Sequence, residues 1–399
     1  MKNLIYCSHA IITLVYFSLL TILLASCATN TNDKNAFTLT ESSETKRIAI
    51  CDETNLYSND IHYYKEPSGV EYLSISNADA NNIAFYRLDS CKLSHIIRIK
   101  RDGKYPINIG SHGVINLDDI FITTMNPYVY RINRNGDVIK NYNFMSYCSE
   151  NRVCSGMDCL SLVYHPLVII NGKIFCPQRI PPTRWNGSPN GTNFEFDECP
   201  LSLTLDTATG VLEALPLSFP ELFDKNDGRQ SHNEGYSRIY DGNQFVFSFF
   251  ALSDIYVTQD FKQFTTYSAT SKLIGEIKNQ GLKSGYDMQQ GQEDYLTREE
   301  YGNILYDQYR EVYYRFCYAK SKKKVNVQYY FENALCREDF SIQIINKDFQ
   351  VVGETMFKAG KYAPKIFFVN EDGLWLSENN LEREDMNEDT LVFRCLKLQ

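Results

Sequence analysis

Short apolar strands separated by polar turns recur along most of the chain. Each is rich in Val, Ile, Tyr or Phe, residue types that favour β-strands, and each is bounded by turn residues. Six such runs lie at 84–88, 129–132, 201–205, 255–257, 342–345 and 391–396. A further hairpin precedes each run, and these hairpins lie at 61–75, 114–123, 167–176, 238–248, 304–318 and 366–377. Turns such as Asn171-Gly172 and Asp241-Gly242 supply the positive φ that tight hairpins require.

Together, the two hairpins of each repeat predict a four-stranded antiparallel sheet. Six such sheets, spaced by roughly 45 to 90 residues, are typical of a six-bladed β-propeller. We therefore expect an all-β propeller over residues 46–399; a pair of β-sandwiches or another number of blades fits the same pattern. The sixth repeat ends without a return strand, which would expose a sheet edge. We expect the N-terminal run 47–51 to pair with the C-terminal run 391–396 and close the ring.

The N-terminal segment has the layout of a bacterial secretory signal. Lys2 precedes an apolar run over residues 10–24, which is followed by two small residues and then Cys27. The sequence Leu-Ala-Ser-Cys at 24–27 resembles the lipobox of bacterial lipoproteins, in which the cysteine is acylated and becomes the first residue of the mature protein. This resemblance implies a signal peptide over residues 1–26 and a membrane-anchoring lipid on Cys27. The polar residues 27–45 are then a flexible tether.

Localisation and charge narrow the class of protein further. Ala28, rather than the aspartate that retains many lipoproteins at the inner membrane, follows Cys27, which favours the outer membrane as the location in the cell envelope. The periplasmic and the external face both remain open. The net charge of −9 and the pI of about 5.3 provide no basic surface for nucleic acid. We therefore expect the membrane as one partner and exclude nucleic acid as another.

The chain resembles a known family over essentially its whole length. The lipobox, the closing strands and the hairpin at residues 301–316 are similar to those of a family of uncharacterised six-bladed β-propeller lipoproteins from anaerobic gut bacteria. The resemblance implies the fold but no activity. The broader class of NHL-like and TolB-like propellers consists mostly of binding modules, with a minority of lyases and hydrolases.

The sequence contains few signs of catalytic chemistry. It has no G-x-S-x-G elbow, no H-E-x-x-H motif, no Walker loop and no C-x-x-C pair, so we predict no cofactor and no metal ion. Cysteines 148, 154, 159, 176 and 199 gather around the long loop of the third repeat, where one or two disulfides are expected in an oxidising compartment. Cysteines 51, 91, 317, 336 and 395 lie in or beside apolar strands and are expected to be buried free thiols.

One group of polar residues is a candidate ligand site. In a propeller, the residues leading into each innermost strand surround the mouth of the central channel, where ligands usually bind. At these positions the sequence has His62, His112, His165, Arg238, Tyr301, Asn303 and Lys365. Imidazoles around a channel could hold a metal ion or transfer protons. We favour the simpler interpretation that these residues fill a wet channel.

Three classes of function fit these observations. We rank first a non-catalytic binding or scaffold module that presents a propeller face to a peptide, glycan or protein, because catalytic motifs are missing. An envelope lyase or hydrolase with its site at the channel mouth comes second, and a structural component of an export or signalling complex comes third. Thr207 and Thr390 are possible O-glycosylation sites, since Asp206-Thr207-Ala208 and Asp389-Thr390-Leu391 resemble the acceptor tripeptide of gut anaerobes.

Overall fold

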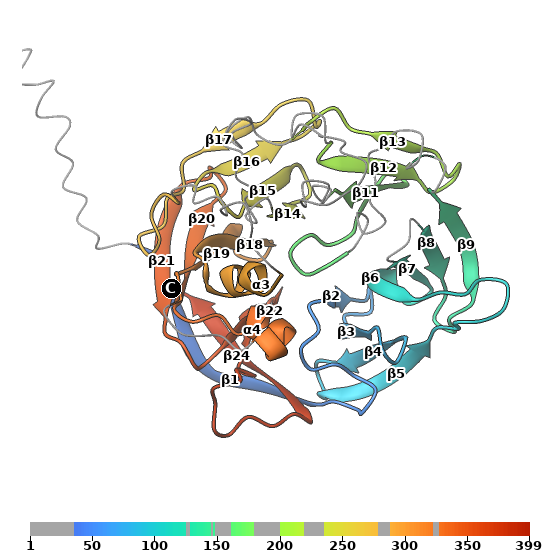
Figure 1. Cartoon of the computed structure of the whole chain (residues 1–399), viewed down its shortest axis with the longest axis horizontal. Coiled ribbons are helices and arrows are strands. Elements are labelled where there is room, and N and C mark those ends of the chain that lie inside the picture. Colours follow the sequence, from blue (N-terminus) through green and yellow to red (C-terminus); the bar gives the residue numbers. More distant parts are fainter. Residues whose placement is uncertain are drawn as a thin grey trace, which may run out of the picture. The chain divides into compact units, whose positions relative to one another are not determined.

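Six four-stranded antiparallel sheets form a ring within residues 37–399 of this computed structural model (Figure 1). The structure describes residues 36–124, 128–144, 147, 161–178, 200–218, 235–277, 288–321 and 327–399. Strands β2, β6, β14, β18 and β22 lie towards the centre of the ring, and β5, β9, β13, β17 and β21 lie at its rim (Figure 1). The fold is therefore a six-bladed β-propeller, as predicted.

The six blades follow one another in sequence order. Blade 1 contains β2 (Ile61–Lys65), β3 (Glu71–Asn77), β4 (Asn82–Arg87) and β5 (Lys92–Arg98). Blade 2 contains β6 (Ile109–Asn116), β7 (Asp119–Thr124), β8 (Tyr128–Ile132) and β9 (Val138–Asn143). Blade 3 contains β10 (Val168–Ile170), β11 (Lys173–Pro177), β12 (Ser202–Asp206) and β13 (Leu212–Ala214).

The second half of the ring repeats this arrangement. Blade 4 contains β14 (Tyr236–Tyr240), β15 (Phe245–Phe249), β16 (Ile255–Thr258) and β17 (Thr265–Tyr267). Blade 5 contains β18 (Glu300–Asp307), β19 (Val312–Tyr318), β20 (Phe340–Asn346) and β21 (Val351–Phe357). Blade 6 contains β22 (Ala363–Asn370), β23 (Gly373–Ser377), β24 (Thr390–Leu398) and, from the other end of the chain, β1 (Leu39–Ala49).

The hydrophobic core is divided among the contacts between neighbouring blades. Phe85 of blade 1 and Ile122 of blade 2 share one apolar cluster, and Tyr314 of blade 5 and Phe367 of blade 6 share another. A middle strand is consequently covered on both of its faces. All seven residues of β19 are buried, whereas the outer strand β5 is mostly exposed. This is why middle strands such as β15 and β19 are largely apolar in the sequence rather than alternating between apolar and polar residues.

Strand β1 closes the ring, as the sequence predicted. It pairs antiparallel with β24, with Ile48 opposite Leu391 and Leu39 opposite Leu398. The predicted domain boundary at residue 46 was wrong, because residues 39–45, assigned to the tether, belong to this strand. Their side chains are mainly polar and exposed, but an edge strand is held by its backbone hydrogen bonds, and Lys361 and Lys397 also pair with Glu41 and Glu44.

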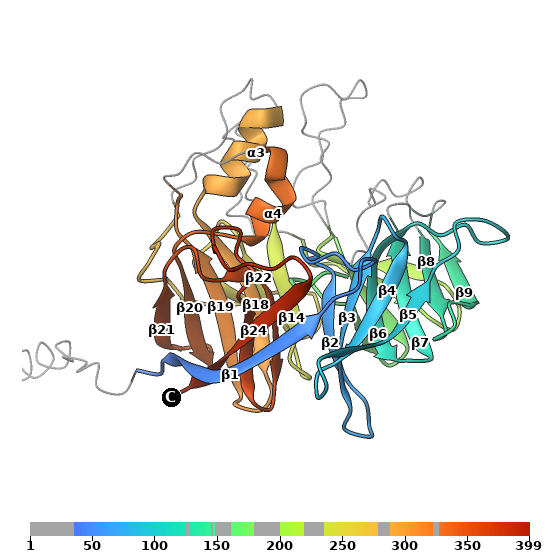
Figure 2. The same cartoon turned by 90° about the horizontal axis from the view of Figure 1, so that it is seen from below.

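Two short helices lie on one face of the ring (Figure 2). Helix α3 (Met288–Thr297) precedes β18, and the 3₁₀ turn η3 (Val327–Tyr329) leads directly into α4 (Tyr330–Leu335) in the connection between β19 and β20. The helices contact each other, and α4 also contacts β22. None of the helices that the structure describes is long and apolar enough to cross a membrane.

Candidate functional site

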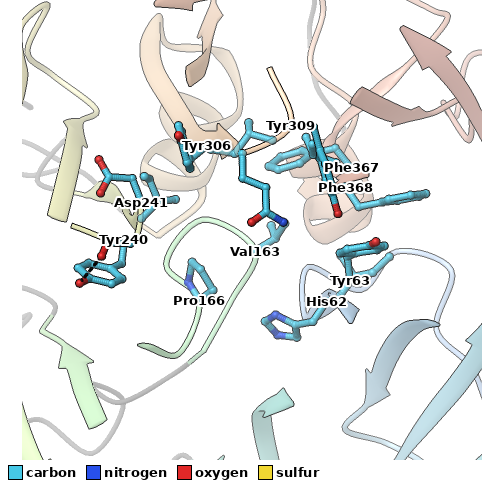
Figure 3. Close-up of a pocket in the computed structure, with 16 residues that line it drawn as sticks. His62, Tyr63, Val163, Pro166, Tyr240, Asp241, Tyr306, Tyr309, Phe367 and Phe368 are labelled. Atoms are coloured by element: carbon cyan, nitrogen blue, oxygen red, sulfur yellow. Dashed lines mark hydrogen bonds between the residues drawn. The ribbon is translucent and has the colours of Figure 1, made fainter. Parts of the chain in front are cut away.

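A cavity of about 490 Å³, here called the channel pocket, is lined by the innermost strands of several blades. Strands β2, β14, β18 and β22 contribute side chains, and the segment before β10 contributes Val163 and Pro166 (Figure 3). Six aromatic residues belong to the lining. They are Tyr63, Tyr240, Tyr306, Tyr309, Phe367 and Phe368. A pocket of this volume, with mostly apolar walls, is typical of a small-molecule site.

Contacts with neighbouring residues hold the aromatic rings in place. Tyr63 and Phe368 come from adjacent blades and stack with their centroids 5.8 Å apart and their planes 4° apart. The Tyr240 hydroxyl donates a 2.8 Å hydrogen bond to the carbonyl of Gly242, whose φ of 101° allows the tight turn between β14 and β15. Tyr306 packs on Tyr313 at 4.9 Å. Such fixed rings provide a preformed apolar surface.

The one carboxylate in the pocket lining is already engaged by the protein. Asp241 accepts a 2.6 Å hydrogen bond from the Tyr313 hydroxyl at Oδ2. Its Oδ1 accepts backbone hydrogen bonds from Asn243 at 2.8 Å and Gln244 at 2.9 Å. Asp241 therefore shapes the turn, and its oxygens are engaged by the protein. Because no lysine or arginine is among the described lining residues, the pocket suits an uncharged ligand.

A second feature, the Asp60 cluster, consists of Asp60, His62, Ser74, Ser76 and His112. The Oδ1 atom of Asp60 lies 2.7 Å from Nε2 of His62, and its Oδ2 atom lies 2.7 Å from Nδ1 of His112. Ser76 and the backbone N–H of His112 also donate to Oδ2. Because Asp60 and His62 are two residues apart at the start of β2, their side chains point to the same side of the chain. The His62 side chain joins the cluster to the channel pocket, whose wall it forms (Figure 3).

Burial and hydrogen bonding set the ionisation of the Asp60 cluster. Burial raises the pKa of Asp60, but its interactions with His112 and then with His62 outweigh that effect and hold the pKa well below its usual range. Burial lowers the pKa of His112, against the opposing influence of Asp60. At neutral pH the cluster therefore contains an ionised, buried carboxylate.

Comparison with known proteins identifies the family. The family model for a domain of unknown function, DUF4221, matches residues 36–356. The chain belongs to the DUF4221 family. A crystal structure of a DUF4221 member from Bacteroides vulgatus is similar, with 24% identity, a TM-score of 0.79, and coverage of 92% of this chain and 99% of that one. No curated protein matches the sequence. The predicted resemblance to a family of uncharacterised six-bladed propellers is thus confirmed.

A more distant structure shares the fold with this DUF4221 chain. It is a Bacteroides fragilis protein described as exported, with 12% identity and a TM-score of 0.51, and the alignment covers 92% of this chain and 98% of that one. At such identities the likeness shows the fold alone.

The seven predicted channel-mouth residues do not form one site in the DUF4221 propeller. His62 and His112 come together in the Asp60 cluster, with their rings 4.7 Å apart. Buried His165 packs against Tyr164 instead, with a centroid distance of 4.3 Å. Asn303 is buried, and its backbone belongs to β18.

Arg238 and Tyr301 make contacts between blades and loops rather than with the pocket. The Arg238 guanidinium donates hydrogen bonds to the Ser202 hydroxyl at 3.1 Å and to the Phe175 carbonyl at 2.9 Å, both in blade 3. The Tyr301 hydroxyl donates to the Gly275 carbonyl at 2.6 Å, and the Arg315 guanidinium lies 3.9 Å from the centre of its ring. These contacts fasten blade 4 to blade 3 and the segment before α3 to blade 5.

Lys365 belongs to a separate buried group, the Glu300 cluster, formed by Arg298, Glu300, Arg337 and Lys365. The Glu300 carboxylate lies 3.0 Å from the Lys365 ammonium, 3.5 Å from Arg298 and 3.8 Å from Arg337. Burial raises the pKa of Glu300, but the charges of Lys365, Arg337 and Arg298 outweigh it and lower the pKa to about 2. This cluster connects β18, β22 and the segment that follows α4.

Other predicted sites lie on the surface or outside the described residues. Thr207 is half-buried beside a turn and donates a 2.7 Å hydrogen bond to the Gly172 carbonyl, and Thr390 begins β24 opposite Ala49. The signal peptide and Cys27 are outside the described residues, as are cysteines 148, 154, 159 and 199. Of the expected buried thiols, Cys317 and Cys395 are free and buried, as predicted. Cys51, Cys91 and Cys336 are only partly buried. Cys176, expected in the disulfide group, is instead a buried free thiol, because strand β11 carries it into the core.

Sequence reasoning missed Asp60 and most of the channel pocket. It considered only the residues that lead into the innermost strands, whereas Tyr240, Tyr306 and Tyr309 lie where β14 and β18 end or turn. The sequence nonetheless contains features that point to Asp60 and to the channel pocket. Asp-Ile-His at 60–62 places two polar side chains on one side of a strand, and aromatic residues accompany two of the inner hairpin turns.

Proposed function

We propose that this DUF4221 protein is a non-catalytic binding module of the cell envelope that holds a compact, uncharged, ring-bearing group in its channel pocket. The group is a sugar residue of a glycan or an aromatic side chain of a peptide. The observation that carries this proposal is the set of six aromatic residues in the lining of a cavity of about 490 Å³.

The walls of the pocket favour a flat, weakly polar ligand. Aromatic residues from blades 1, 4, 5 and 6 line one common space (Figure 3). Phe367 and Phe368 are buried and belong to the cores between blades, and they support this wall from behind. Burial of a ligand ring against aromatic side chains removes a large apolar area from water and adds stacking energy. The Tyr63 and Tyr240 hydroxyls already donate to Glu71 and to the Gly242 carbonyl. The amide of Gln308, which also lines the pocket, can orient a sugar or a peptide group.

The envelope location is supported by the N-terminal sequence. The apolar run before Cys27 and its small flanking residues have the layout of a lipoprotein signal, and a structurally similar Bacteroides fragilis protein is described as exported. We infer that a lipid on Cys27 holds the propeller at the membrane, with the outer membrane favoured by Ala28.

Ligand binding can be tested with two matched tyrosine variants. Purified protein is titrated calorimetrically with neutral oligosaccharides and with uncharged peptides containing Trp or Tyr. We expect 1:1 binding of one of these classes and at least a tenfold weaker affinity in Tyr309→Ala, which removes a pocket wall and costs about 1.4 kcal/mol or more. Tyr329→Ala, which removes an exposed tyrosine outside the pocket lining, should bind as the unmodified protein does.

The titration distinguishes the two ligand classes from each other and from a failure of the proposal. A response to oligosaccharides alone identifies a glycan receptor, and a response to peptides alone identifies a peptide receptor. The proposal is wrong if neither class binds, or if Tyr309→Ala and Tyr329→Ala bind equally well.

A further inference from the structure

The Asp60 cluster places three metal-binding side chains within reach of one ion. An Asp60 oxygen and one nitrogen from each of His62 and His112 all lie within 4.8 Å of one another. Two imidazoles and a carboxylate form a donor set that suits zinc and other divalent transition metals. We propose that Asp60, His62 and His112 bind a divalent transition-metal ion at the wall of the central channel. This site goes beyond the proposed pocket ligand and does not depend on it.

The spacing of the three ligand atoms is compatible with a single ion. With zinc–ligand bonds of about 2.0 to 2.1 Å, neighbouring atoms in a tetrahedral site are about 3.3 Å apart. The two contacts of Asp60 with the imidazoles are 2.7 Å, and no pair in the set exceeds 4.8 Å. Small rotations of the side chains therefore suffice to surround an ion. His62 is the most free to move, because it is partly exposed at the pocket.

The charge of the cluster also favours a cation. The Asp60 carboxylate is buried, and no lysine or arginine in the described part of the chain forms an ion pair with it. A buried carboxylate is costly unless positive charge and hydrogen bonds compensate it. Ser76 and the backbone N–H of His112 provide hydrogen bonds but no charge. A divalent ion would place positive charge beside Asp60 without requiring either imidazole to be protonated.

The hydrogen bond of Ser74 prepares His112 to act as a ligand. The Ser74 hydroxyl donates to the backbone carbonyl of His62 at 3.3 Å, and its oxygen lies 2.8 Å from Nε2 of His112. In the metal-free cluster, Nδ1 of His112 donates a hydrogen bond to Asp60, 2.7 Å away. A bound cation would replace that proton, and the Ser74 oxygen would then accept the proton carried by Nε2. Metal-binding histidines commonly donate their other ring N–H in this way.

The location of the cluster gives the ion access to the channel. His62 belongs to the pocket lining, whereas Asp60 and His112 are buried outside it. An ion held by three protein ligands keeps a fourth position for water or for a ligand. We place that open position on the side of His62.

Metal titration of the untagged protein tests the proposal. The protein is treated with a chelator, dialysed, and titrated with Zn²⁺ by calorimetry near pH 7.5. We expect one ion per chain, and at least a tenfold weaker affinity in His62→Ala. His95→Ala is the matched control. His95 is an imidazole outside the cluster that stacks on Phe85 at 4.5 Å, so its loss should leave Zn²⁺ binding unchanged.

A second readout needs no substitution. Co²⁺ added to the metal-free protein should produce the visible absorption bands of a four- or five-coordinate cobalt site, and one equivalent of Zn²⁺ should abolish them. The proposal is overturned if the protein binds less than one Zn²⁺ per chain, if the cobalt bands do not form, or if His62→Ala and His95→Ala bind Zn²⁺ equally. None of these results affects the proposed pocket ligand, whose test uses Tyr309.

Discussion

Replacement of Ile48 by alanine measures how much the closing strand β1 stabilises the ring. Ile48 is fully buried between β24 and blade 1, in a cluster with Leu73 and Phe393. The substitution removes three carbons, worth about 2.4 kcal/mol at about 0.8 kcal/mol each, and leaves a cavity that adds to the loss. We expect the free energy of unfolding to fall by about 3 kcal/mol and the Tm by about 4 °C.

Urea unfolding followed by circular dichroism provides the measurement, and Ile139→Ala provides the control. Ile139 lies in the outer strand β9 with 53% of its surface exposed, so the same change should cost less than about 0.5 kcal/mol there. If β1 does not close the ring, Ile48 is no more buried than Ile139, and the two variants will lose the same stability. That result would refute the reasoning about closure.

Three further outcomes are expected. Cys27→Ser should move the protein from the membrane to the soluble fraction of its native host, and a variant that stays with the membrane would disprove the lipid anchor. Glu300→Ala should cost about 3 to 5 kcal/mol, because it leaves the three cations of the Glu300 cluster buried without their carboxylate. The pKa of Glu300 is about 2 in the folded protein and about 4.3 in the unfolded chain. Its contribution to the free energy of unfolding is therefore complete above about pH 5 and falls as the pH drops from about 4 to 2. The Glu300→Gln variant should lack this loss of stability when it is titrated with acid. Intact-mass analysis from the native host should reveal glycans at Thr207 or Thr390, and a mass equal to polypeptide plus lipid would exclude both.

The repeated pattern of the strands was enough to predict the architecture from the sequence. Each blade places two hairpins in a fixed order, so apolar runs and turn residues recur with the architecture itself. The first part of β1 was missed because its pairing depends on backbone groups and its side chains are polar. Helices α3 and α4 were missed because the prediction was based on apolar strands and turns and assigned no secondary structure to the connections before β18 and between β19 and β20.

The candidate site was predictable only in part. His62 and His112 were found because their positions follow from the repeat, and the structure brings them together around Asp60. Arg238 and Lys365 occupy equivalent positions in their own repeats. Arg238 instead donates a hydrogen bond to Ser202 of blade 3, and Lys365 forms an ion pair with Glu300. The partner of a buried charged side chain is set by contacts between blades. The sequence of a single blade therefore does not predict which partner it will have.

The pairing of β1 with β24 has a consequence for the order of folding. During synthesis β1 emerges first, and its partner is made only when residues 390–398 appear at the other end of the chain. An unpaired strand in a partly folded chain is a site for aggregation, and contacts so distant in sequence form late. The charged and hydroxyl side chains of residues 40–46 keep this segment soluble in the meantime. The polar residues that made the first part of β1 hard to predict thus also protect the partly folded chain from aggregation until β24 is made.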